Sequence, residues 1–581
     1  MGNRPSRQRA SRRLSLIVGV ALLATACVPS TGREPQDAGG PRAATSGSAE
    51  PRGTLRIAWP IEPENLHAKV AGAQSGSADF SWVFNSFLTY FDMQGVTHPL
   101  LAREIPSQER GDWRINADGT MVTTYRLREN ARWHDGAPLT ARDFVLGYQV
   151  AVDPEMPIRD RLPEALMAGV EATDEHTVVI TWLEPYFRAN TLSYLQLDPL
   201  PSHLFAEKYR TNKANFVFGE EWTAGYIGNG PFRVERWTPG SGLVARANLN
   251  WVLGPPRIET LDIRFIPDPR TELANLLAEE VDLINSPAVR GAEAAVARDQ
   301  LVPAGRGYVR SWQKTIRYLE FQFRDVPNWQ RAVTDVRVRH ALRQAVDHAT
   351  LVEALTHGFG SVADAFIVPP DPFFSQVEGA IVKYPYDPAR AATLLADAGW
   401  TRPRPGAQVA SPGGQVLDVE IWSTADGGSE QEALILTDYW KAVGINATIN
   451  LIPVARQREN ELRVSFPAVN GTARTGNLDN FVWTSVNIPT QEARWQGTNR
   501  GSFQDTDIDA LHKRALATFA PAEQASAVAA LHRRMSELLG ISPLYYQANV
   551  LLARSRLKGP LGEPADSSGM AWNVFEWEVA D

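Results

Sequence analysis

The chain has 581 residues, of which 44% are hydrophobic and 21% are charged, and this composition excludes disordered and fibrous proteins. Acidic residues number 66 and basic residues 58, and the net charge of −8 argues against a nucleic-acid partner, because such proteins usually carry a basic surface. The single cysteine excludes a disulfide framework and a cysteine-based metal cluster.

Residues 1–26 have the three parts of a secretory signal. A basic start with five arginines and no acid precedes an apolar stretch, Leu14 to Ala24, that is too short to span a bilayer of roughly 30 Å. Small residues then lead to Cys27, in a segment that resembles a bacterial lipobox with Ala24 in place of the usual leucine. We predict cleavage before Cys27 and lipidation of Cys27, with a plain signal peptide as the alternative.

Residues 27–52 are rich in Pro, Gly, Ser, Thr and Ala and cannot bury enough apolar surface to become ordered. As a flexible tether of about 23 residues, such a segment spans roughly 25 Å. Arg12-Arg13 is weakly similar to a twin-arginine signal, so the general secretory route and the twin-arginine route both stay open. No later stretch approaches about 18 uninterrupted apolar residues, and we expect a folded body held at a membrane by its lipid.

Predicted strands begin directly after the tether. In the first, residues 53–59, Leu55, Ile57 and Trp59 alternate with polar or small residues. An Asp118-Gly119 pair predicts a type I′ hairpin turn, because both positions favour positive φ. The other predicted strands are 121–127, 177–183, 261–266, 318–323, 416–422 and 446–452.

Helical periodicity separates the later strands. Asp335 is the predicted N-cap of one helix, and Asp387-Pro388 opens a second helix that ends at Gly399. A third helix is predicted from about Glu432 to Val443. Strands that alternate with helices indicate an α/β fold.

Four motif blocks follow one another in an order that covers nearly all of residues 53–555. They are Pro99 to Phe144 with Trp133-His134-Asp135-Gly136 inside it, Ile227 to Phe232, Asp335 to Ala341, and Tyr386 to Trp400. In this order they resemble the extracytoplasmic solute-binding proteins of the peptide/nickel class, which serve oligopeptide and dipeptide ABC importers. Asn229 and Phe232 depart from the Thr and Tyr that are usual in this family.

The resemblance implies an α/β, two-lobed fold like that of the type II periplasmic binding proteins, in the large three-part version. Residues 53–310 and 531–581 are expected to form lobe I, with a subdomain inserted at about 97–225, and residues 311–530 to form lobe II. The two lobes are expected to close over a ligand by a hinge. The Trp133–Gly136 signature is expected to be a folding device away from the cleft.

Seven residues are predicted to bind the ligand, partly because tryptophan rings offer apolar area together with a polar N–H. The resemblance places three of them in the cleft after the first strand, and the other four in lobe II, mostly in a loop between Phe466 and Trp483. The seven residues are Trp59, Ile61, Glu62, Trp422, Asn470, Arg474 and Trp483.

Oligopeptide binders of this family place an aspartate shortly after a tryptophan, where it pairs with the α-ammonium group of the peptide. Here Trp483 is followed by Thr484, Ser485, Val486 and Asn487, whereas Asp479 precedes it. Either the alignment slips by a few residues or this anchor is missing. A missing anchor would leave the ammonium group unpaired, which makes sugars and glycolipids stacked on tryptophan serious alternatives to peptides.

No catalytic or metal site stands out in the sequence. Adjacent acids such as Glu279 and Glu280 diverge on either a helix or a strand. The Gly-x-Ser-x-Gly, His-Glu-x-x-His and P-loop patterns are absent, and the ten histidines lack zinc-ligand spacing. We therefore expect no enzymatic activity, no cofactor and no metal.

These features together predict a monomeric, lipid-anchored receptor outside the cytoplasm that binds small peptides and delivers them to ABC permease subunits. A first alternative is a binding protein for an oligosaccharide or glycolipid. A second is an envelope sensor or regulator that keeps the fold but takes no part in transport.

Overall fold

The computed structural model describes residues 50–67, 69–70, 77–156, 158, 161–286, 289, 291–453, 456–457, 459–475, 478, 483–491, 495, 497–562 and 569–580. Contacts divide the chain into residues 1–47 and residues 48–581, and the fold concerns the second unit. The predicted signal, Cys27 and most of the predicted tether lie outside the described residues. None of the helices in the described ranges is long and apolar enough to cross a membrane.

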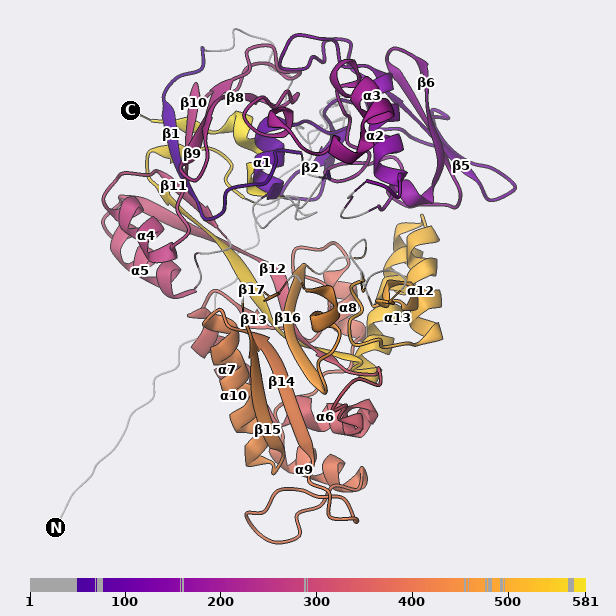
Figure 1. The fold of residues 1–581 in the computed structure, drawn as a ribbon, viewed down its shortest axis with the longest axis vertical. Coiled ribbons are helices and arrows are strands. Elements are labelled where there is room, and N and C mark those ends of the chain that lie inside the picture. Colours follow the sequence, from indigo (N-terminus) through magenta and orange to yellow (C-terminus); the bar gives the residue numbers. More distant parts are fainter. Residues whose placement is uncertain are drawn as a thin grey trace, which may run out of the picture. The chain divides into compact units, whose positions relative to one another are not determined.

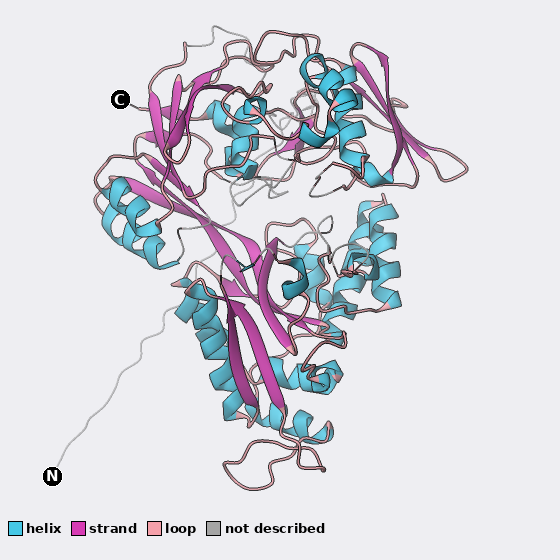
Figure 2. Cartoon of the chain, viewed as in Figure 1, coloured by secondary structure: helices cyan, strands magenta, loops and turns pink. Residues whose placement is uncertain are grey.

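The largest sheet in the described part of the chain has eleven strands (Figures 1 and 2). Along the sheet the order is β15 (Asn446–Ile452), β14 (Asp418–Thr424), β16 (Val469–Thr475), β12 (Gly307–Phe321), β17 (Ile541–Arg554), β11 (Leu283–Ser286), β1 (Thr54–Trp59), β10 (Thr260–Phe265), β9 (Gly242–Ala247) and β8 (Phe232–Thr238), with β13 (Ser361–Val362) paired to β17. β1 is parallel to β10 and β11, and β14 is parallel to β15 and β16. The long antiparallel pair β12–β17 joins these two parallel parts.

Smaller sheets and the helices complete the fold. A four-stranded sheet has the order β4 (Trp113–Ile115), β5 (Met121–Arg126), β7 (Thr177–Trp182) and β6 (Met167–Asp174), and two pairs are β2 (Thr89–Phe91) with β3 (Thr97–Pro99) and β18 (Leu557–Lys558) with β19 (Glu578–Val579). The α-helices are α1 (Ser77–Phe84), α2 (Ala141–Val152), α3 (Ser202–Thr211), α4 (Pro269–Leu277), α5 (Gly291–Leu301), α6 (Val336–Gln344), α7 (His348–Thr356), α8 (Phe374–Ala380), α9 (Pro388–Asp397), α10 (Gly428–Ala442), α11 (Asn460–Arg463), α12 (Thr506–Ala517) and α13 (Pro521–Leu538). Short 3₁₀ turns include η1 (Glu164–Leu166), η2 (Lys213–Asn215), η3 (Glu220–Trp222), η4 (Arg331–Thr334), η6 (Ser485–Asn487) and η7 (Met570–Glu576).

Local signals determine several of these boundaries. The Asp335 carboxylate caps α6 by accepting a hydrogen bond from the Arg337 N–H over 2.9 Å. Asp387 caps α9 in the same way, with Pro388 in the first turn and Gly399 at a φ of +91° just after the helix. These two helix starts and the first strand confirm the sequence predictions.

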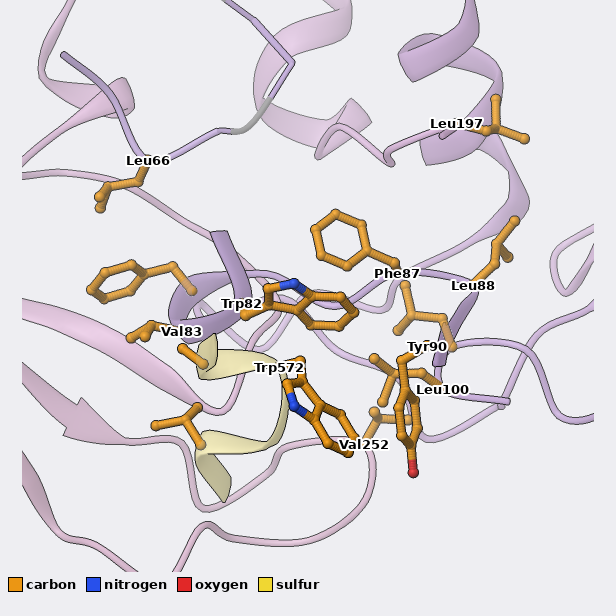
Figure 3. Packing of buried hydrophobic residues seen from close by; sticks show 14 of the residues in the cluster. Leu66, Trp82, Val83, Phe87, Leu88, Tyr90, Leu100, Leu197, Val252 and Trp572 are labelled. Atoms are coloured by element: carbon orange, nitrogen blue, oxygen red, sulfur yellow. The ribbon is translucent and has the colours of Figure 1, made fainter. Parts of the chain in front are cut away.

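Four clusters of buried apolar side chains form the core. The largest, here called the first core, spans Leu55 to Trp577 and includes the four-stranded sheet. Figure 3 shows part of it, where the Trp82 ring meets Phe87 edge-on at 4.7 Å and Tyr90 lies 5.6 Å from Trp572. A small cluster packs α4 and α5 against the sheet. The first core therefore joins segments from both ends of the chain.

Two further clusters, here called the second core, lie on opposite faces of the sheet around β12. Leu319 and Phe321 pack with residues of α6, α9 and α10, whereas Ile316 and Tyr318 pack with residues of α8, α12 and α13. The split follows from the alternation of side chains along a strand. Helices thus cover both faces of this half of the sheet, as in other α/β folds.

The structure differs from the sequence predictions in three places. Asp118 has a negative φ and Gly119 a φ of +86°, and Gly119 N–H bonds to Asn116 O over 3.0 Å, so the turn is not type I′. The predicted loop between Phe466 and Trp483 contains β16. β12 begins at Gly307 instead of Tyr318, because its first half is partly exposed and its apolar residues there lack regular alternation.

Candidate ligand-binding site

Of the three residues predicted after the first strand, Glu62 contacts the β8–β9 hairpin. Trp59 ends β1, is buried, and pairs in register with Phe265 of β10. Ile61 is half-buried. The Glu62 carboxylate accepts hydrogen bonds from Trp237 Nε1 over 2.7 Å and from the Gly240 N–H over 2.8 Å. Glu62 therefore fixes the hairpin turn, and its role in ligand binding stays a prediction.

Two residues predicted in the other half lie in one row across three strands. Trp422 on β14 pairs with Asn470 on β16, and Asn470 pairs with Glu320 on β12. Asn470 donates from Nδ2 to Oε2 of Glu320 over 3.0 Å, and Trp422 donates from Nε1 to Oε1 of Glu420 over 2.5 Å. Partners in register place their side chains on the same face of a sheet, so this row is continuous and polar.

Two arginines belong to the same region. Arg474 lies on the same face of β16 as Asn470, because four residues along a strand restore the side-chain direction. Arg474 and Arg500 are half-buried, and neither guanidinium group forms an ion pair with any other described residue. Burial raises the pKa of Glu320, while the charge of Arg500, the hydrogen bond from Asn470 and the charge of Arg474 lower it. Both guanidinium groups therefore lie within electrostatic reach of the buried Glu320 carboxylate.

Glu320 was not predicted as a site residue. It is 1% exposed, and its Oε1 has no hydrogen bond of full geometry among the described residues, although the backbone N–H of Arg500 helps to lower its pKa. A buried carboxylate oxygen in that state is costly unless a donor reaches it. The signal in the sequence is an acid inside the apolar run Tyr318–Phe323, where the strand pattern alone would place an uncharged side chain.

Trp483 lies in the second core. It is 3% exposed, and its ring lies 4.3 Å from Phe366 and perpendicular to Tyr318 at 5.4 Å. These contacts give the ring a packing role, and its contact with a ligand stays a prediction.

The turn after Trp483 is fixed by side-chain hydrogen bonds. Ser485 N–H donates to Oδ1 of Asp509 over 2.9 Å, and Asn487 Nδ2 donates to Oγ1 of Thr484 over 2.9 Å. Asp509 on α12 is thus engaged in holding this turn. Asp479, the acid considered as an ammonium anchor, lies outside the described residues.

The Trp133–Gly136 signature has a structural role, as expected. His134 Nδ1 accepts a hydrogen bond from the Gly228 N–H, and Nε2 donates to Gly230 O, both over 3.1 Å. Burial lowers the pKa of His134 to about 4, so the ring is neutral near pH 7. The imidazole therefore ties the first motif block to the second.

A buried polar cluster lies in the first core. Lys69 forms an ion pair with the Glu164 carboxylate and donates to Leu195 O over 2.6 Å. Burial raises the pKa of Asp198 to about 7, against the charge of Lys69, which lowers it. Asp198 and His67 line a cavity of about 10 Å³, which suits one water molecule rather than a solute. In the part of the chain described, no group of three acids, histidines or cysteines could hold a metal ion.

Comparisons with known proteins place this geometry in a family. Residues 98–489 match the bacterial extracellular solute-binding proteins, family 5 Middle. The oligopeptide-binding protein AppA of Bacillus subtilis is 22% identical over 99% of both chains, and the heme-binding protein A of Haemophilus influenzae is 24% identical over 77% of this chain and 79% of its own.

Solved structures agree with the sequence match. The oligopeptide binding protein of Thermus thermophilus, crystallised with a pentapeptide, has a TM-score of 0.74 at 22% identity and covers 90% of this chain and 96% of its own. The family match spans more than half of the 581 residues. The chain therefore belongs to the bacterial extracellular solute-binding proteins of family 5 and has their mixed α/β, type II periplasmic-binding-protein fold.

Proposed function

We propose that this protein captures peptides outside the cytoplasm and hands them to the permease of an ABC importer, without changing them chemically. The observation that carries the proposal is the polar row Trp422–Asn470–Glu320, with Arg474 and Arg500 beside it and without ion-pair partners among the described residues. The names of AppA and of the Thermus protein, both oligopeptide binders, support the same ligand class.

The chemistry of the row suits a peptide with a free carboxylate. An arginine and a carboxylate form charge-assisted hydrogen bonds, often two in parallel, which are stronger than neutral ones. Asn470 and Trp422 offer amide and aromatic surface for a peptide backbone and an apolar side chain. In this proposal Glu320 orients Asn470 and limits the repulsion between the two guanidinium groups.

A hinge supplies the capture step in this proposal. β12 and β17 pair from Gly307–Arg554 at one end to Glu320–Ile541 at the other, and they pass between the first core and the second core. Bending of such a strand pair is a common route to domain closure. The predicted division into residues 53–310 with 531–581 and residues 311–530 belongs to the proposal, with one change: Leu531, Met535 and Ile541 pack in the second core and are therefore grouped with residues 311–530.

Neutral oligosaccharides fit the row less well than peptides do. A sugar could stack on Trp422, but it would bring no counter-ion for the charges of Arg474 and Arg500 in a partly desolvated place. One relative is named for binding heme, which is an anionic ligand. The experiment must therefore distinguish peptides from other ligands that carry a carboxylate.

A melting-temperature screen of the chain from residue 27 onward tests the ligand class. Mixed peptides of two to ten residues, the same peptides with amidated C-termini, neutral oligosaccharides and heme form the four arms. Binding at 100 times Kd stabilises the folded state by about 2.7 kcal/mol, so free-acid peptides are expected to raise the Tm by several degrees. A Tm rise with saccharides or heme alone would overturn the proposal.

Lipid anchoring at Cys27 is a separate part of the proposal. It is supported by the signal-like residues 1–26 and by Cys27 being the one cysteine of the sequence. Metabolic labelling with a fatty acid in a bacterial host should mark the wild-type chain and leave Cys27→Ser unlabelled. Equal labelling of both proteins, or release of both into the soluble fraction, would contradict the anchor.

A further inference from the structure

The first core and the second core meet at a second place, away from β12 and β17. There, the segment after β7 and one residue of β4 contact the end of α12 and the turn that follows it. Phe187 N–H donates to Leu516 O over 3.2 Å, and Lys513 Nζ lies 3.1 Å from Oε2 of Glu184. These contacts join residues that are more than 300 positions apart in the chain.

Each side places an aromatic ring against the core of the other. Phe187, which follows β7, packs against both the first core and the second core. Phe519, in the turn between α12 and α13, packs against the first core and meets Trp113 of β4 edge-on at 5.4 Å and 73°. The exchange of rings is reciprocal, which distinguishes this contact from two surfaces that merely touch.

The position of this contact matters for closure. In Figure 1, β12 and β17 run between the two halves on one side, and the end of the α12–α13 pair points toward the region of β5 on the other. The half built around the first core and the half built around the second core are therefore connected covalently at one edge and non-covalently at the other. Separating the halves about the strand pair requires this second contact to break.

The fold of either half does not need the contact. α12 and α13 are packed in the second core through Ile508, Ala515, Leu531 and Met535. Lys513 and Glu184 are 75% and 45% exposed, so water and salt weaken their attraction. The contact is therefore weak, because it consists of a screened ion pair, one backbone hydrogen bond and two partly buried rings. A contact of this strength can open and close.

We propose that Trp113, the segment 184–187 and the segment 513–519 form a latch that biases the protein toward its closed arrangement before any ligand arrives. A device of this kind shifts the population of closed molecules in the absence of ligand and slows their opening. It acts on the ligand-free protein, so it stands or falls independently of the peptide proposal.

Hydrogen–deuterium exchange of the ligand-free protein tests the latch. The Phe187 N–H donates a hydrogen bond to Leu516 O across it, so this amide should exchange slowly while the latch is closed. Lys513→Glu with Phe519→Ala should raise exchange at Phe187 about tenfold and increase the radius of gyration measured by X-ray scattering. Arg533→Glu, which makes the same charge change on neighbouring α13 at an exposed pair with Glu537, should change neither quantity.

Swapping the charges of Lys513 and Glu184 provides the decisive comparison. Both side chains are exposed, so each position accepts a positive or a negative charge. Lys513→Glu alone should raise exchange at Phe187 about threefold, and Lys513→Glu with Glu184→Lys should restore the wild-type rate. Unchanged exchange and scattering in the Lys513→Glu, Phe519→Ala protein would overturn the latch. Rapid exchange at Phe187 in the wild-type protein would overturn it as well.

Discussion

Asn470 on β16 donates a hydrogen bond to Glu320 on β12 over 3.0 Å, although the two residues are 150 positions apart in the chain. They are direct cross-strand partners, and Trp422 extends the same row on β14. The pairing of three strands thus brings a buried carboxylate, an amide and an indole together next to Arg474. This row is the basis of the proposed ligand site, and its chemistry and that of the surrounding fold lead to four predictions.

Breaking the buried ion pair between Arg317 and Glu432 should be costly. The guanidinium binds the carboxylate through two hydrogen bonds of 2.9 and 2.6 Å, and both side chains are at most 10% exposed. Glu432→Gln leaves a buried cation without a full counter-charge, so the free energy of unfolding in urea should fall by about 3 kcal/mol. Glu459→Gln provides the matched control.

The control pair has the same geometry but lies at the surface. Arg456 binds Glu459 through two hydrogen bonds of 2.8 and 2.7 Å, with about half of each side chain exposed. Solvent already satisfies both charges there, so the substitution should leave stability unchanged. Equal losses in the two variants would contradict the role given to burial.

Replacing Asp198 should change how stability depends on pH. Burial raises the pKa of Asp198 to about 7, so between its unfolded value of 3.8 and pH 7 the folded state holds the proton more tightly. Stability contributed by this proton is present below pH 4 and is lost as pH rises through about 7. In the wild type, Asp198 should lower the unfolding free energy by about 3 kcal/mol between pH 5 and pH 8. Asp198→Asn should lack this contribution, because asparagine does not titrate.

Asp118→Asn is the control for this measurement. Asp118 is fully exposed, and the hydrogen bonds from Thr120 lower its pKa, so it is ionised throughout the range from pH 5 to pH 8. Its removal should leave the pH profile of stability parallel to that of the wild type. Parallel profiles of the wild type and Asp198→Asn in this range would contradict the assignment for Asp198.

His134→Leu should destabilise the protein without reducing ligand binding. The substitution leaves the Gly228 N–H without its acceptor, while Gly230 O keeps only the hydrogen bond from Asn248 Nδ2, which should cost about 2 kcal/mol in unfolding free energy. His203→Leu removes a histidine of the same region whose 2.7 Å contact with Asp135 is largely exposed, and it should have a small effect. Loss of binding in a folded His134→Leu protein would refute a purely structural role.

The sequence was informative wherever a local pattern decides the structure. The Asp335 and Asp387 caps, the alternation in β1 and the strand at Asn446–Ile452 are all set by residues within one short segment. β12 was located only in its C-terminal half, because its apolar residues before that, such as Tyr308, Val309 and Trp312, do not alternate regularly with polar ones. The Asp118-Gly119 turn shows that a dipeptide signal predicts a turn better than its type.

The site could be predicted only in part, since strand register is a tertiary property. Trp422, Asn470 and Arg474 are predicted from the segments that the family resemblance places in the cleft, but their alignment with Glu320 depends on the pairing of β12, β14 and β16. Glu320 sits in an apolar run, where an acid gives no sign of the face it occupies. Nothing in the local sequence of Phe187 or Phe519 indicates that each packs against the other half.

Calorimetry of Arg474→Gln with a peptide identified by the Tm screen tests the central claim most directly. Wild-type protein should bind the free-acid peptide at least tenfold more tightly than its C-terminal amide, a difference of about 1.4 kcal/mol. Arg474→Gln should lose that preference, and Arg298→Gln on the exposed surface of α5 should keep it. Equal affinity of the wild-type protein for the acid and the amide, with Arg474→Gln unchanged, would contradict the account.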